Sequence, residues 1–307
     1  RRVLFRSGGH ARHPRRRRAH GRADARRSGA HLDGPLLAWI GCGAADPPPP
    51  PPARPAVGRS GVLATACEAS ALIPWDGGWL VGDNEDAEQL YSYEASWRPR
   101  PPVRLPSAVD DIEALVAVDG GYWVIGSHSR SGKGERREAR ERILRPDGQL
   151  LPIDFSACAA CVAASERAPD AGGLNLEAAA WANGKLWLGL RSPLDASGAA
   201  LLLGVATSGA VDEVVKVDLG GDGFRDLAPD GAGLLVVSGG VADGGGMGLW
   251  SLASPTATPE RLAVPLQGNV EGLALSPDGS LVFVTDGSGK PGRCKEPSVW
   301  GSLPFHR

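Results

Sequence analysis

The chain repeats one pattern of apolar and polar positions five times. Each copy begins with a charged residue, runs through a short apolar stretch, turns near a glycine, and returns through a second apolar stretch that ends in polar residues. Short apolar stretches joined by glycine-containing turns predict pairs of antiparallel strands. The copies cover residues 68–83, 113–128, 177–191, 225–238 and 271–286.

The spacing of these copies predicts the fold. Their first residues are 45, 64, 48 and 46 positions apart. A repeat of about 40–50 residues built from short strands is typical of a β-propeller with one four-stranded blade per repeat. We therefore predict an all-β propeller with five recognisable four-stranded blades, closed by the chain ends. Segments 55–66 and 294–305 are the candidate closing strands, and a sixth blade built from them is left open.

The N-terminal region differs in composition from the repeats. Residues 1–41 contain eleven Arg and two Asp, and residues 1–7 resemble a translated sequencing adapter. We interpret 1–41 as adapter-derived or untranslated sequence, or as a signal segment, and exclude it from the fold prediction. Nucleic-acid binding by its basic run is an alternative. A tether over 42–58 and a single propeller domain over 59–307 are then expected.

A short apolar segment, 36–42, ends in Gly41-Cys42 and is followed by small residues. It resembles the end of a bacterial lipoprotein signal, in which Cys42 would carry the lipid, although a buried apolar turn is the alternative. The segment is too short to span a bilayer. Prolines 47–52 predict a stiff spacer after it. We expect a periplasmic or outer-membrane-anchored bacterial protein that contacts the membrane only through Cys42.

The charge of the predicted mature domain argues against nucleic acid as a partner. Without residues 1–41 the chain carries 22 basic and 33 acidic residues, a net charge of −11. The phosphates of nucleic acids carry charge of the same sign and would repel such a domain. The expected partner is a small anionic ligand or a component of the cell envelope.

Four cysteines follow Cys42. Cys158 and Cys161 are three residues apart, without a second Cys pair or a His pair to accompany them. A local disulfide, or two ordinary small residues, explains them better than half of a zinc site. Cys67 precedes the first repeat and Cys294 follows the last, so a closed ring would place them on neighbouring blades. A Cys67–Cys294 disulfide is expected if the compartment is oxidising.

Hairpin geometry predicts a charged site on one face of the propeller. A hairpin returns to the side on which it began, so residues that open an inner strand share a face with residues that close the return strand. The opening residues, which should ring the mouth of the central channel, are Glu68, Glu113, Glu177, Arg225 and Glu271. The closing residues include Asp83, Glu85, His128, Arg130, Arg191 and Asp286.

Four carboxylates that converge on one axis need a compensating charge. Calcium takes six to eight oxygen ligands and suits such a ring. The candidate metal ligands are Glu68, Glu113, Glu177 and Glu271. The alternative is a hydrated charge network without metal, neutralised by Arg130, Arg191 and Arg225. Further candidate ligand-binding residues around the mouth are Asp83, Glu85, Asp226 and Asp286.

The arginines favour an anionic ligand, because guanidinium groups pair with carboxylate or phosphate. His128 is the single His of the repeat region and is a candidate general acid or base, with a structural role as the alternative. The candidate catalytic residues are His128, Arg130, Arg191 and Arg225. The repeats contain no nucleophile elbow, no paired metal-binding His and no phosphate-binding loop before a helix.

Four stretches resemble a known family. They are 125–130 (Ile-Gly-Ser-His-Ser-Arg), 174–177 (Leu-Asn-Leu-Glu), 189–194 (Gly-Leu-Arg-Ser-Pro-Leu) and 218–227 (Asp-Leu-Gly-Gly-Asp-Gly-Phe-Arg-Asp-Leu). They are similar to motifs of a bacterial β-propeller family of unknown function, which itself resembles esterase-like phytase domains. The resemblance implies a propeller that hydrolyses a small ester or phosphoester. A non-catalytic envelope propeller that binds a ligand or a protein is the alternative, since propellers host many activities.

Overall fold

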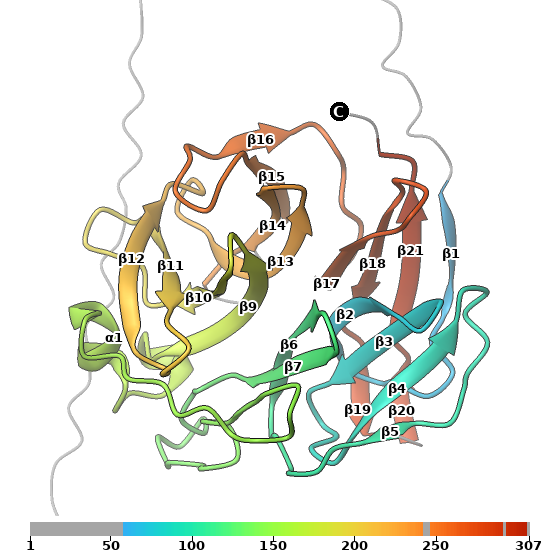
Figure 1. Ribbon diagram of the computed structural model, residues 1–307, viewed down its shortest axis with the longest axis horizontal. Helices are drawn as coiled ribbons and strands as arrows, with labels where there is room; N and C mark the ends of the chain where they lie inside the picture. The colour runs from blue at the N-terminus through green and yellow to red at the C-terminus, as the bar shows by residue number, and fades with distance from the viewer. Residues whose placement is uncertain (1–57, 242–245, 291–292, 306–307) are drawn as a thin grey trace, which may run out of the picture. The chain divides into compact units, whose positions relative to one another are not determined.

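Five antiparallel sheets surround a common axis and form a five-bladed β-propeller (Figure 1). The computed structural model describes residues 58–241, 246–290 and 293–305. The predicted leader, Cys42 and the tether up to residue 57 lie outside the described residues. Among the helices that the structure describes, none is long and apolar enough to cross a membrane.

The first four blades each follow the chain order from the inner strand outward. The first blade consists of β2 (Ala69–Trp75), β3 (Gly78–Asp83), β4 (Gln89–Glu94) and β5 (Val103–Arg104). The second consists of β6 (Ile112–Val118), β7 (Gly121–Gly126) and β8 (Ile143–Leu144). Its fourth position is a single bridge between Leu144 and Leu150, so this blade is less regular than predicted.

The third and fourth blades are complete four-stranded sheets. The third consists of β9 (Asn175–Ala182), β10 (Lys185–Ser192), β11 (Ala200–Val205) and β12 (Val211–Val217). The fourth consists of β13 (Gly223–Asp230), β14 (Gly233–Gly239), β15 (Gly248–Leu252) and β16 (Glu260–Leu262). Helix α1 (Ala159–Ala164) and a 3₁₀ turn, η1 (Pro169–Ala171), lie between the second and third blades.

Both chain ends contribute to the fifth blade, so they do not form the sixth blade that the sequence left open. The inner strands are β17 (Val270–Leu275) and β18 (Leu281–Thr285), and the outer strands are β21 (Val299–Leu303) and then β1 (Arg59–Val62). The four residues of β1 pair with Val299–Ser302 of β21. The described N-terminal strand therefore closes the ring by completing the last blade.

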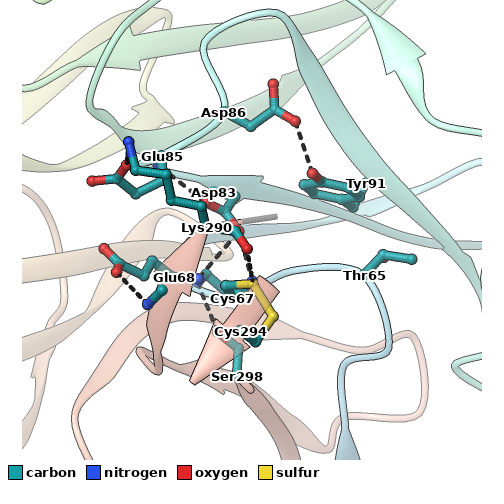
Figure 2. Close-up of a disulfide and its surroundings, with 12 residues drawn as sticks. Thr65, Cys67, Glu68, Asp83, Glu85, Asp86, Tyr91, Lys290, Cys294 and Ser298 are labelled. Carbon is teal, nitrogen blue, oxygen red and sulfur yellow. Dashed lines mark hydrogen bonds and ion pairs between the residues drawn. A yellow bond between two sulfur atoms is a disulfide. The ribbon is translucent and has the colours of Figure 1, made fainter. Parts of the chain in front are cut away.

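Two further features hold this closure together. Cys67 and Cys294 form a disulfide, with Cys294 on the small hairpin of β19 (Ser288–Lys290) and β20 (Arg293–Glu296) (Figure 2). The indole of Trp97 stacks between those of Trp79 and Trp300, with ring centroids 5.4 and 4.8 Å apart. Because Trp79 belongs to the first blade and Trp300 to β21, this stack joins the two blades at the seam.

The glycine-containing turns expected between paired strands are present, and three tryptophans pack between the blades. Asp76-Gly77 and Asn183-Gly184 each form a two-residue hairpin turn with positive φ at both positions, a conformation that Asn, Asp and Gly tolerate best. Trp79, Trp123 and Trp187 are 7%, 8% and 4% exposed and pack with apolar residues of a neighbouring blade. They therefore stabilise the contacts between blades.

Candidate functional site

A β-bulge at the start of every inner strand aims one side chain at the channel. In each hairpin the pairing register shifts by one residue near this point, and the extra residue is left unpaired. Bulges are a common way to re-aim a side chain next to a functional site. The five bulge residues are Ser70, Glu113, Glu177, Arg225 and Glu271.

These bulge residues line one cavity of about 130 Å³ at the mouth of the channel. The structure thus brings Glu113, Glu177, Arg225 and Glu271 together, as expected from their shared register. The other lining residues are Asn84, Arg191, Asn269 and Asp286. Farther along the same inner strands the channel becomes apolar, with a cavity of about 150 Å³ lined by residues such as Leu72, Leu115 and Leu227.

The predicted register of the first blade was wrong by two residues. The bulge residue of β2 is Ser70, whereas Glu68 precedes the strand and lies outside the lining of the cavity. The carboxylate of Glu68 instead accepts a hydrogen bond of 2.9 Å from the backbone N–H of Gly289. The repeats were aligned by their first charged residue. This places the first repeat wrongly, because its bulge position holds an uncharged Ser.

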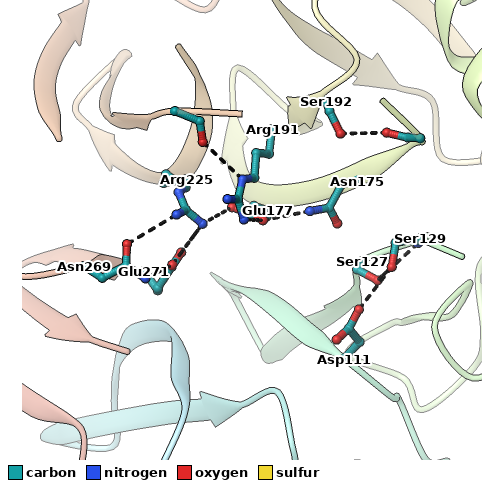
Figure 3. A network of polar contacts seen from close by, with 12 residues as sticks. Asp111, Ser127, Ser129, Asn175, Glu177, Arg191, Ser192, Arg225, Asn269 and Glu271 are labelled. Atoms are coloured by element: carbon teal, nitrogen blue, oxygen red, sulfur yellow. Dashed lines mark hydrogen bonds and ion pairs between the residues drawn. The ribbon is translucent and has the colours of Figure 1, made fainter. Parts of the chain in front are cut away.

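A continuous chain of ion pairs crosses the mouth (Figure 3). Arg225 Nη1 lies 2.8 Å from Glu177 Oε2 and 3.0 Å from Glu271 Oε1. Arg191 Nη1 donates to Glu177 Oε1 at 2.8 Å, and Arg191 Nε donates to the carbonyl of Gly240 at 3.3 Å. Each guanidinium therefore already pairs with a carboxylate. Arg225 and Arg191 therefore compensate carboxylate charge at the mouth, whereas Arg130, the third arginine expected to do so, does not line it.

Two asparagines that were not among the predicted site residues complete the network. Asn175 Nδ2 donates to Glu177 at 2.7 Å, and Asn269 Nδ2 donates to Glu271 at 2.6 Å. Both belong to an Asn-x-Glu motif at the same position of the third and fifth repeats. The repetition of this motif is the sequence signal that could have identified them.

Burial raises the pKa of three acidic side chains at the mouth. The pKa of Glu113 lies well above its usual value, because of burial and of the charges of Asp111 and Glu177. The pKa of Glu271 is raised to about 8 by burial and then by Glu177. Burial and the charge of Glu68 raise the pKa of Asp286 to about 6. The mouth therefore holds carboxyl groups that retain or exchange protons near neutral pH.

Several acceptors at the mouth lack a partner among the described residues. The Oδ1 atoms of Asn84 and Asp286 are buried and accept no hydrogen bond there. The carboxylate of Glu113 has neither a hydrogen bond nor an ion pair within the described part of the chain, whereas Ser70 Oγ donates to the carbonyl of Ile112. These atoms are the groups with which a ligand could bond.

Three predicted ligand-binding residues do not line the cavity. Asp83 is fully buried, and its carboxylate accepts hydrogen bonds from the backbone N–H groups of Cys67, Glu68 and Glu85 (Figure 2). Asp226 accepts from the backbone N–H of Leu273 on the next blade. Glu85 pairs with Lys290 at 3.2 Å. Asp83 and Asp226 thus satisfy buried backbone donors, which is a structural use of a carboxylate.

His128 and Arg130 also lie outside the channel mouth. They line a separate pocket with residues such as Glu141 and Phe155. The predicted catalytic set is therefore divided between two sites, because the long connections of the second blade carry His128 and Arg130 away from the axis. Within the described residues, no group of three or more His, Cys, Asp or Glu side chains is placed to hold a metal ion.

No family model and no curated protein sequence matches the chain. Solved structures with a similar fold include the xyloglucan PUL protein GH43B of Bacteroides ovatus, with 15% identity, a TM-score of 0.49 and coverage of 74% of this chain. This chain spans 50% of that protein. The glutaminyl cyclase of Myxococcus xanthus has 12% identity and a TM-score of 0.44, with 81% of this chain and 97% of that one covered.

A streptogramin B lyase has 13% identity and a TM-score of 0.40, with 80% of this chain and 98% of that one covered. At these identities the likeness concerns the fold alone. The protein is a five-bladed β-propeller, and its structural neighbours carry the names of several different enzymes.

Proposed function

We propose that the mouth of the channel binds a small polar ligand that brings hydrogen-bond donors or a positive charge. The observation that carries this proposal is the carboxylate of Glu113, which lines the cavity and has no partner among the described residues. Glu113 is half-buried, and its carboxyl group offers the cavity an acceptor without a partner, so a donor placed against it would contribute binding free energy.

The other groups at the mouth favour the same chemistry. Arg225 and Arg191 already pair with Glu177, while Asn84 Oδ1 and Asp286 Oδ1 are unsatisfied acceptors within the described residues. Among the buried atoms of the mouth, these two unsatisfied acceptors outnumber the unsatisfied donor, Arg225 Nε. For this cavity we propose a ligand that carries an ammonium or hydroxyl group, in place of the anionic ligand expected from the sequence. A volume of about 130 Å³ accommodates a very small molecule or one end of a larger one.

A calcium ion is the inorganic alternative to an organic ligand in this cavity. The oxygens of Glu113, Asp286 and Asn84 are of the type that calcium prefers. The described residues nevertheless contain no group of three acidic, His or Cys side chains placed to hold an ion. An organic ligand therefore fits the arrangement better than a tightly held calcium ion, and calcium serves as a comparison in the test.

Ethanolamine, which carries both donor types, should raise the melting temperature of the protein, and Glu113→Gln should remove this response. Stabilisation follows because a ligand that binds only the folded state shifts the unfolding equilibrium. Since the pKa of Glu113 is raised, the response should strengthen with increasing pH as the side chain becomes ionised. Differential scanning fluorimetry measures each shift, with Glu260→Gln on exposed β16 as the control.

Acetate and CaCl₂ are tested in parallel with ethanolamine. Stabilisation by acetate but not by ethanolamine would contradict this proposal and support the anionic ligand expected from the sequence. A response to CaCl₂ that Glu113→Gln removes would identify the cation as calcium.

A second candidate function is hydrolysis of a small ester at the same mouth. The observation that favours it is that Glu113 and Glu271 have raised pKa values next to Glu177, which pairs with two guanidinium groups. Acid and base pairs arise where neighbouring carboxyl groups sit in such different environments. The resemblance to esterase-like phytase domains supports this candidate. A screen of carboxylate and phosphate esters tests it, and any true activity should be lost in Glu113→Gln.

We also propose that the protein is exported and anchored through Cys42. Support comes from two disulfides, Cys67–Cys294 and Cys158–Cys161, since disulfides persist mainly in oxidising compartments. Cells that express the full chain should incorporate a palmitate analogue into the protein, and Cys42→Ala should abolish the label. Label that persists in Cys42→Ala would exclude this residue as the anchor.

A further inference from the structure

The second blade carries extra residues that build a second pocket. Its repeat is 64 residues long, against 45 to 48 for the others. The surplus lies in the β7–β8 connection, 127–142, and in the segment 152–174 that contains α1. Both segments line a pocket of about 700 Å³, which shares no lining residue with the cavity at the channel mouth. Long ordered connections in compact domains are commonly functional.

This pocket is held in a defined shape. The Cys158–Cys161 disulfide joins the N-cap residue of α1 to a residue inside the helix. Arg130 Nε donates to the carbonyl of Ser165 at 2.7 Å, and Arg130 Nη2 pairs with Glu166 at 2.6 Å, so the two segments are bonded to each other. A volume of this size and a preformed wall are typical of sites for small molecules.

His128 is one of the residues that line the pocket, and its side chain holds an unsatisfied acceptor. Its side chain packs edge-on against Phe155, and the residue is only 8% exposed. Nδ1 lies 3.0 Å from the carbonyl of Gly126, so Nδ1 carries the proton and Nε2 carries the lone pair. Nε2 is buried and has no hydrogen-bond partner among the described residues. A buried acceptor without a partner has lost its hydrogen bonds to water, and a donor from a ligand would offset this loss.

Four of the five charged side chains that line the pocket form ion pairs, and the fifth, Glu138, is exposed. Arg130 pairs with Glu166, and Arg136 forms three hydrogen bonds to Glu141, at 2.9, 3.0 and 2.6 Å. The remaining wall includes apolar side chains, namely Ile153, Phe155 and Leu174. An anionic ligand would have to compete with the carboxylates of these ion pairs, whereas an uncharged ligand leaves both pairs intact. A cation could pair only with Glu138, and an exposed ion pair contributes little binding free energy.

We propose that this second pocket binds an uncharged, partly apolar small molecule that donates a hydrogen bond from a hydroxyl or amide group to Nε2 of His128. The apolar part of the ligand would lie against Phe155 and Leu174. This site is independent of the function proposed for the channel mouth, because the two sites share no lining residue.

The test compares two probes that differ in a single hydrogen-bond donor. The hydroxyl of 2-naphthol can donate to Nε2, and the ether oxygen of 2-methoxynaphthalene cannot. We expect 2-naphthol to bind the full chain about 3- to 10-fold more tightly than the ether, the value of one net hydrogen bond. In protein labelled with ¹⁵N-histidine, 2-naphthol should also shift the Nε2 resonance of His128.

Two variants separate this site from the channel mouth. His128→Asn suits the positive φ of 54° at this position and should lower the affinity for 2-naphthol to that for the ether. Glu113→Gln should leave both affinities unchanged. Equal binding of the two probes, binding of neither, or an unchanged preference in His128→Asn would each overturn the proposal. The comparison of probes on the unmodified protein decides the matter even if His128→Asn does not fold.

Discussion

Replacing Arg225 by Ala should lower the free energy of unfolding by about 3–5 kcal/mol above pH 8, where its partners are ionised; this is the range found when one partner of a buried ion pair is removed. Arg225 is 7% exposed and neutralises two carboxylates at once, Glu177 at 2.8 Å and Glu271 at 3.0 Å. Without it, both carboxylates remain near Glu113 in a place that water barely reaches. Urea unfolding followed by tryptophan fluorescence measures the difference.

The effect of Arg225→Ala should depend on pH in a predictable direction. Arg225 lowers the pKa of Glu271 and Glu113, although burial keeps both above their usual value. As the pH falls through these pKa values the carboxyl groups take up protons and no longer need the guanidinium. The stability deficit of the variant should therefore shrink between pH 8 and pH 5.

Arg137→Ala is the matched control for this prediction. Arg137 is exposed, and its loss should change stability by less than about 0.5 kcal/mol. If Arg225→Ala behaves like Arg137→Ala, the ion-pair network does not stabilise the mouth, and the assignment of Arg225 as its central cation is wrong.

Removal of the Cys67–Cys294 disulfide should destabilise the propeller by about 5 kcal/mol, as the chain-entropy model gives for a loop of this length. The two cysteines are 227 residues apart, so the cross-link restricts nearly the whole unfolded domain. For a domain of this size the loss corresponds to a fall in melting temperature of roughly 10–20 °C. The double variant Cys67→Ala/Cys294→Ala avoids placing a hydroxyl at the buried Cys67 position.

The other disulfide of the same domain provides the control. Cys158 and Cys161 are only three residues apart, so the same model gives about 1–2 kcal/mol for Cys158→Ala/Cys161→Ala. Thermal unfolding of both double variants under non-reducing conditions measures the ratio. Equal losses would show that loop length does not set the contribution and that local packing does.

Local features of the fold could be predicted from the sequence because they depend on neighbouring residues. Apolar runs with turns such as Asp76-Gly77 and Asn183-Gly184 specify hairpins, and their repetition specifies blades. The same reasoning located Glu113, Glu177, Arg225 and Glu271, since each occupies the same place in its repeat. It misplaced the first blade, because nothing in the local pattern marks the uncharged Ser70 as the bulge residue.

Ring closure and the partners of the charged side chains could not be derived in this way. β1 and β21 are more than 200 residues apart in the chain, and only the closure of the ring decides that they complete the fifth blade. The same holds for Asp83 and Asp226, whose carboxylates bond to backbone N–H groups that the ring brings near.

The sequence by itself therefore determined the number of blades visible as repeats and the residues that open each inner strand. Tertiary structure decided that His128 and Arg130 belong to one pocket and Arg191 and Arg225 to another. Hairpin geometry specifies the end of the blade at which a residue lies. The distance of that residue from the axis depends on how long connections pack against other blades. Such packing joins segments that are distant in the chain, so no local sequence pattern predicts it.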